Sequence, residues 1–114
     1  MRIIFHAHHA KSVSERLLDR AQAALDRIGE RLPRTRDAVV RFEGDGPVRR
    51  VEIVLRAPRR GDVVAEGRGK SFGPALTAAL TRLEAQIGRV KRIAVARVRR
   101  ERVARERARG ALTA

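Results

Sequence analysis

The stretch from residue 63 to residue 92 constrains the fold more than any other part of the chain. Its apolar residues first alternate and then, after Gly67 and Gly69, recur at spacings of three and four. Alternation is typical of a strand and the longer period of one helix face, so we predict a strand, a tight turn and a long helix. Ser71 or Gly73 is the expected N-cap. The predicted buried face of the helix consists of Phe72, Leu76, Ala79, Leu80, Leu83, Ile87 and Val90.

An earlier helix is expected between residues 12 and 33. Ser12 and Ser14 are both candidate N-caps, because a serine hydroxyl can accept a hydrogen bond from a free N–H of the first turn, and Pro33 ends the helix. Its apolar stripe is formed by Leu17, Ala21, Ala24, Leu25, Ile28 and Leu32. One flank of that stripe is basic and carries Arg16, Arg20, Arg27 and Arg31. This flank is either a basic edge that contacts RNA or a solvated face with ion pairs along the helix.

Three further runs alternate as half-buried strands, and they are residues 3–7, 37–43 and 48–56. The last two flank turn residues at 44–47 and form a hairpin. A strand, helix, strand order favours a right-handed crossover, so the first two strands should be parallel with both helices on one sheet face. The predicted fold is α+β, with the order β-α-β-β-β-α and a four-stranded mixed sheet.

The chain carries 27 basic and 13 acidic residues, a net charge of +14, and 24 of the basic residues are arginine. An arginine-rich genome would explain the choice of Arg over Lys, but not the excess of base over acid. The planar guanidinium suits phosphate, so an anionic polymer is the natural partner. Residues 91–109 hold nine basic and two acidic residues, a net charge of +7. We therefore predict a domain over residues 1–92 and a basic tail or helix extension over residues 93–114.

The sequence Gly69-Lys70-Ser71 lies between a strand and a helix, where a nucleotide-binding P-loop would lie. That motif needs a further glycine at the position of Val64, so we do not expect a nucleotide site. A helix N-terminus beside Arg68 and Lys70 can still hold a phosphate of a larger ligand.

The histidines His6, His8 and His9 allow a second small-ligand hypothesis. Alternation places His6 and His8 on one side of a strand, but no third metal ligand is evident beyond His9. Exposed imidazoles at a strand end are the preferred interpretation. We expect no metal and no cofactor.

Other absences limit the class of protein. There is no cysteine, no long apolar run and no start that resembles a signal peptide, so we expect a cytoplasmic protein without a membrane partner. The only aromatic residues are Phe5, Phe42 and Phe72, all predicted to face the core. Without exposed aromatic rings to stack on bases, recognition should depend on RNA phosphates and shape.

Two motifs of this chain occur in a known family. They are Val13-Ser14 with Leu17, and Val64-Ala65-Glu66 followed by Phe72, Ala75-Leu76, Ala79, Arg82-Leu83-Glu84 and Gln86-Ile87. With them, residues 1–93 resemble the ribosome hibernation-promoting and ribosome-associated inhibitor proteins, also called sigma modulation proteins. Ser71-Phe72-Gly73 departs from the family's Asp-Met-Tyr, and Thr77 replaces an Asp.

The resemblance implies a fold similar to a double-stranded RNA-binding domain and binding to the small ribosomal subunit near the decoding centre. It also implies that the messenger and transfer RNA sites are occluded. At positions where the family carries basic residues facing ribosomal RNA, this chain has Arg27, Arg82, Arg89 and Lys91 or Arg92. Nothing after Arg92 matches the dimerising domain of long members, so we expect a short form.

The sequence thus predicts a nonenzymatic translation inhibitor that binds ribosomal RNA and takes no small-molecule substrate. The alternative is a general double-stranded RNA-binding or nucleoid protein that uses the same basic helices. A phosphate- or metal-dependent hydrolase is the least favoured hypothesis. The predicted RNA-binding residues are Arg20, Arg27, Arg68, Lys70, Arg82, Arg89, Lys91 and Arg92.

Overall fold

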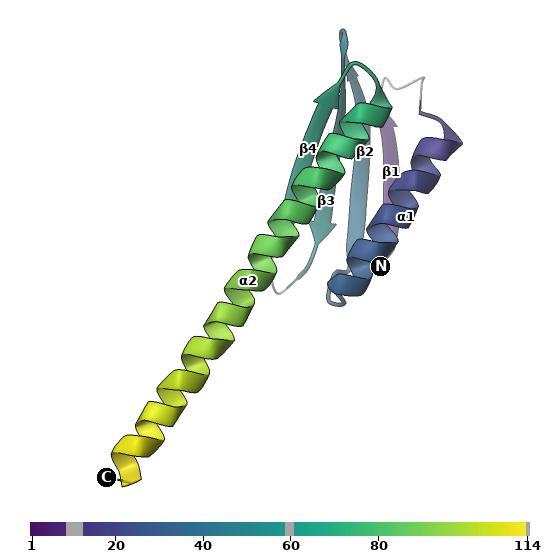
Figure 1. Cartoon of the computed structure of the whole chain (residues 1–114). Helices are drawn as coiled ribbons and strands as arrows, with labels where there is room; N and C mark the ends of the chain where they lie inside the picture. The colour runs from purple at the N-terminus through teal and green to yellow at the C-terminus, as the bar shows by residue number, and fades with distance from the viewer. Residues whose placement is uncertain (9–12, 59–60, 114) are drawn as a thin grey trace.

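The computed structural model of the chain describes residues 1–8, 13–58 and 61–113, and Figure 1 shows one sheet with two helices on the same face. The elements in chain order are β1 (Arg2–His8), α1 (Glu15–Arg31), β2 (Asp37–Asp45), β3 (Val48–Arg56), β4 (Val63–Gly69) and α2 (Phe72–Thr113). The strands lie side by side in the order β1-β2-β3-β4. Strands β1 and β2 are parallel and the other two pairs are antiparallel. The predicted α+β fold, its element order and its mixed sheet are confirmed.

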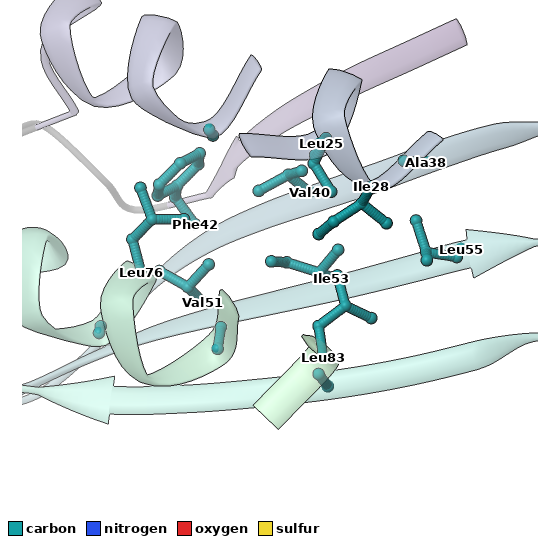
Figure 2. Close-up of a cluster of buried hydrophobic side chains, with 14 of the residues drawn as sticks. Leu25, Ile28, Ala38, Val40, Phe42, Val51, Ile53, Leu55, Leu76 and Leu83 are labelled. Atoms are coloured by element: carbon teal, nitrogen blue, oxygen red, sulfur yellow. The ribbon is translucent and has the colours of Figure 1, made fainter. Parts of the chain in front are cut away.

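The core fills the space between the sheet and the helices, as Figure 2 shows. Phe42 of β2 lies at its centre, 6.5 Å from the ring of Phe5 and 5.6 Å from the ring of Phe72. Leu25 and Ile28 from α1 and Leu76 and Leu83 from α2 pack against the same sheet face. The residues of both predicted stripes are buried or partly buried, apart from Val90, whose side chain lies outside the described part of the structure. All three aromatic rings pack in or against the core, as the sequence predicted.

The hairpin between β2 and β3 is tighter than the four-residue turn that the sequence predicted. Asp45 pairs with Val48 and Gly44 with Arg49, so only Gly46 and Pro47 remain outside the strands. Gly46 has a φ of 58°, a left-handed conformation that glycine adopts at little cost. The strands therefore run further than the alternation of residues 37–43 indicated, because backbone pairing continues through Gly44.

The caps of the helices resolve two alternatives. Ser14 is the N-cap of α1, and its hydroxyl accepts a hydrogen bond from the backbone N–H of Leu17 at 3.3 Å. The other candidate, Ser12, lies outside the described residues. Helix α2 begins directly after Ser71, whose carbonyl accepts a hydrogen bond from Ala75, so Gly73 lies inside the first turn.

Helix α2 packs closely on β4 because Gly67 has no side chain. A Cβ atom on Gly67 would overlap the carbonyl oxygen of Ala75 and the backbone nitrogen of Ala79. The glycine that the sequence placed in a turn is therefore within a strand, and it permits close contact between the strand and helix backbones. Helix α2 then continues past the sheet for a total of 42 residues and gives the molecule a long axis of 70 Å.

We expect Gly67→Ala to destabilise the fold by roughly 3 kcal/mol, since the new methyl group meets backbone atoms that cannot move aside without shifting α2. Chemical denaturation of the variant and the parent protein measures this difference. Gly73→Ala is the matched control, because a Cβ atom there meets nothing within 4 Å. A G67A variant as stable as the G73A variant would contradict the role of this close contact.

Candidate nucleic-acid interface

The basic flank of α1 faces α2. Arg20 Nη1 donates to the carbonyl of Gly73 at 3.4 Å, and Arg20 also donates to the hydroxyl of Thr77. Near the other end of α1, Arg31 forms an exposed ion pair with Glu84 at 3.8 Å. The two helices therefore run side by side in the same direction, as Figure 1 shows. Arg27 lies on this flank between the two contacts and is exposed, with no polar partner among the described residues.

The predicted residues Arg82 and Arg89 lie on the opposite flank of α2, beside the edge of β4. Arg82 Nη1 donates to the carbonyl of Glu66 at 2.6 Å, and Gln86 Nε2 donates to the carbonyl of Val64 at 2.7 Å. These carbonyls belong to the unpaired edge of β4, so both side chains satisfy backbone acceptors that would otherwise need water. Arg89 continues the flank two turns beyond Arg82 and is exposed. The predicted arginines thus form two groups separated by α2.

The remaining predicted residues are dispersed. Arg68 lies on the sheet face that carries no helix, which we call the open face, where its Nε donates to Glu66 at 2.8 Å. Lys70 is exposed in the short link between β4 and α2. Lys91 and Arg92 are exposed and follow Ile87, the last buried residue among those described in α2. The structure therefore does not bring all eight predicted residues into one patch.

On the open face, Arg50 and the glutamates around it form a cluster of opposite charges. The sequence analysis did not predict this cluster. Arg50 donates to Glu43 at 2.9 Å and to Glu52 at 3.0 Å, and its Nε lies 2.7 Å from Glu66. The hydrogen bonds of Arg50 and Arg68 lower the pKa of Glu66 from its ordinary value of 4.5 to about 2. The hydrogen bonds of Arg50 to Glu66 and Glu43 raise the pKa of Arg50 further above its usual range. The acidic residues of the sheet are thus largely used in pairing, and the face offers little free positive charge.

The helical side has the opposite character. Residues 72–92 of α2 contain a single acidic residue, Glu84, against Arg82, Arg89, Lys91 and Arg92. The acidic residues of α1 lie opposite its buried stripe, on the side of the helix away from the sheet, and are Glu15, Asp19, Asp26 and Glu30. Free positive charge therefore gathers along α2 and on the flank of α1 that faces it. This surface, which we call the helical face, is the candidate interface with an anionic polymer.

The sequence matches a family model described as "Sigma 54 modulation protein / S30EA ribosomal protein" over residues 3–94. The chain belongs to this family. The match covers most of the chain, and it ends where α2 leaves the sheet. Family membership confirms the resemblance found in the sequence and places the protein among ribosome-associated proteins.

Solved structures agree with this assignment. A ribosomal subunit interface protein from Coxiella burnetii is similar with a TM-score of 0.71 and 16% identity, over 80% of this chain and 98% of that chain. The N-terminal domain of Protein Y from Thermus thermophilus is similar with a TM-score of 0.65 and 26% identity, over 82% of this chain and 99% of that chain. No match was found among curated protein sequences. The family fold thus accounts for the sheet and the adjoining parts of both helices.

The metal hypothesis gains no support from the geometry of the described residues. Within the described ranges, no three His, Asp or Glu side chains come together in a way that could hold a metal ion. His6 is exposed, whereas His9 and the side chain of His8 lie outside the described part of the structure. No helix in the part of the chain that the structure describes is long and apolar enough to cross a bilayer.

The Glu66 cluster predicts a specific dependence of stability on pH. Because the folded pKa of Glu66 is lowered to about 2, its charged form stabilises the fold above pH 4.5, and this stabilisation is lost as the pH falls toward 2. Glu66→Gln should therefore destabilise the protein near neutral pH, and the difference should vanish in acid. Glu30→Gln on α1 is the control, since no polar partner of Glu30 is found among the described residues. Denaturation curves across this range measure both variants, and a difference that persists unchanged in acid would contradict the prediction.

Proposed function

We propose that this protein binds the small ribosomal subunit through ribosomal RNA phosphates and occludes the messenger and transfer RNA sites, in the cytoplasm and without catalysis. Family membership over residues 3–94 carries this proposal. The unpaired arginines of the helical face support it, because they can neutralise phosphates without reading bases. The three buried or partly buried phenylalanines also support it, since no ring is available to stack on a splayed base.

The two groups of arginine define how such a surface would act. Arg20 and Arg82 each use part of their hydrogen-bonding capacity within the protein, so they are held in place and can present their remaining N–H groups. Arg27 and Arg89 lie on either side of α2 and have no such contact among the described residues. Inhibition then follows from occupancy, because a folded body on the messenger and transfer RNA sites excludes both ligands. No bond needs to be broken.

The distribution of the protein in a cell tests the proposal. In stationary cells the protein should sediment with small subunits or whole ribosomes, and purified small subunits carrying it should bind less messenger and transfer RNA. Sedimentation through a gradient and a filter-binding assay measure these outcomes. A protein spread over bulk RNA or DNA would instead support the alternative, a general double-stranded RNA-binding or nucleoid protein.

We predict that Arg27→Gln with Arg89→Gln weakens binding to the small subunit and flattens its salt dependence by about one unit of log–log slope for each lost phosphate contact. Arg41→Gln is the matched control, because Arg41 is equally exposed and, within the described residues, equally without a polar partner, but lies on the open face. Binding titrations at several salt concentrations measure the slopes. Equal slopes for the double variant and the parent protein would count against the helical face.

A further inference from the structure

The part of α2 beyond the family match has no counterpart in the family fold. The match ends at residue 94, whereas α2 continues as one helix to Thr113. At 1.5 Å per residue this segment, which we call the arm, is about 29 Å long. Every described side chain from Lys91 to Gly110 is exposed, so the arm projects from the domain, as Figure 1 shows.

The charge of the arm is distributed around the whole helix. Seven arginines lie between residues 97 and 109, and successive residues turn by about 100° about the axis. Their directions leave no side of the helix without an arginine. Against these seven arginines the same stretch carries two acidic residues, Glu101 and Glu106.

The apolar residues of the arm show which partners it does not fit. Ile93, just before the arm, is 65% exposed, and Val95, Val98 and Val103 within it are 53%, 59% and 42% exposed. They point in different directions around the helix, so they form neither the continuous apolar face of a membrane-surface helix nor the seam of a coiled coil. The arm has no aromatic residue that could stack on the bases of a single strand.

We infer that the arm is a second RNA-binding element, which lies along a groove of double-helical RNA between its two phosphate backbones. A groove presents phosphates to a helix from two sides, which matches arginines on all sides of the arm, whereas a flat anionic surface meets only one side. The contacts reach phosphates rather than bases, so the binding does not depend on sequence. The inference rests on the proposed function in one respect only, which is that the RNA helix belongs to the ribosome.

The continuity of α2 lowers the free-energy cost of ordering the arm when RNA binds. Starting a helix is the unfavourable step in helix formation, and here the turns packed on β4 already provide the nucleus. The arginines of the free arm repel one another, and phosphates on both sides relieve that repulsion. Bound RNA should therefore increase the helical content of the arm as well as neutralise it.

The test compares two variants of the full-length chain. Arg99, Arg100, Arg102 and Arg105 are replaced by glutamine in one and by lysine in the other, so that helix propensity is kept and only the first variant loses charge. The probe is a blunt RNA duplex of about 16 base pairs, the span that a double-stranded RNA-binding domain covers. Titrations at several salt concentrations give the log–log slope, and circular dichroism reports helical content with and without RNA.

The glutamine variant should lose up to about 3.6 units of slope, given four phosphate contacts at about 0.9 each as on B-form DNA, while the lysine variant should keep the slope. The parent protein should gain helical signal with RNA and the glutamine variant should not. An unchanged slope in the glutamine variant would overturn the inference. Tighter binding of the parent protein to phosphatidylglycerol vesicles than to the duplex would do so as well.

The outcome is separable from that of the proposed function. In one outcome, the glutamine variant of the arm binds the duplex as the parent protein does, while the R27Q/R89Q variant no longer binds the small subunit. In that case the arm is not an RNA-binding element and the proposed function stands. If the glutamine variant of the arm no longer binds the duplex and the parent protein does not bind ribosomes, the arm binds RNA and the proposed function fails. Unaltered denaturation curves establish that the arm substitutions leave the domain folded.

Discussion

The structure depends on the close contact between α2 and β4, which a single missing side chain permits. At Gly67 the strand backbone approaches the backbone of α2 between Ala75 and Ala79. This approach sets the height of the helix above the sheet and aligns its buried stripe with the core. It also brings Arg82 and Gln86 within reach of the free carbonyls of β4. The position of the basic flanks therefore follows from the close packing of α2 on β4. It does not require contacts among the arginines themselves.

Charge is separated between the two sides of the sheet, and pairing explains the separation. On the open face Arg50 lies among three glutamates, so the charges of this cluster have opposite partners. Along α2 the only acidic residue near the domain is Glu84, which meets Arg31 in an exposed contact worth little in water. Helix α2 carries eleven basic and three acidic residues, so most of the net positive charge of the chain lies along it, on the helical side. An anionic partner approaching the molecule would be drawn toward that side over distances of about a Debye length.

Sequence reasoning found the fold because each element has one apolar face with a clear period. The stripe of α1, the alternation of β2 and β3 and the three phenylalanines all appear where the period placed them. It found the site less well, for two physical reasons. The cluster at Arg50 depends on the register between β2, β3 and β4, since Glu43, Glu52 and Glu66 are distant in sequence. Opposite charges on one face of adjacent predicted strands were the available signal. The contact of Arg82 with β4 depends on how closely α2 approaches the sheet, and the helical periodicity of the sequence does not give that distance.

The rigidity of α2 also determines how the arm and the domain would cooperate. A flexible basic tail loses conformational entropy when it binds, and its effective concentration near a second site falls as the linker lengthens. A helix that continues directly from the domain lowers both costs, because its packed turns already fix where it starts, but it can reach only those phosphates that lie along its axis. The helical arm is therefore less adaptable than a flexible tail, but it holds its arginines at a fixed distance and direction from the domain. For an RNA partner that is itself rigid, such as a helix in a folded particle, a fixed direction adds selectivity, because affinity is gained only where the RNA geometry matches that axis.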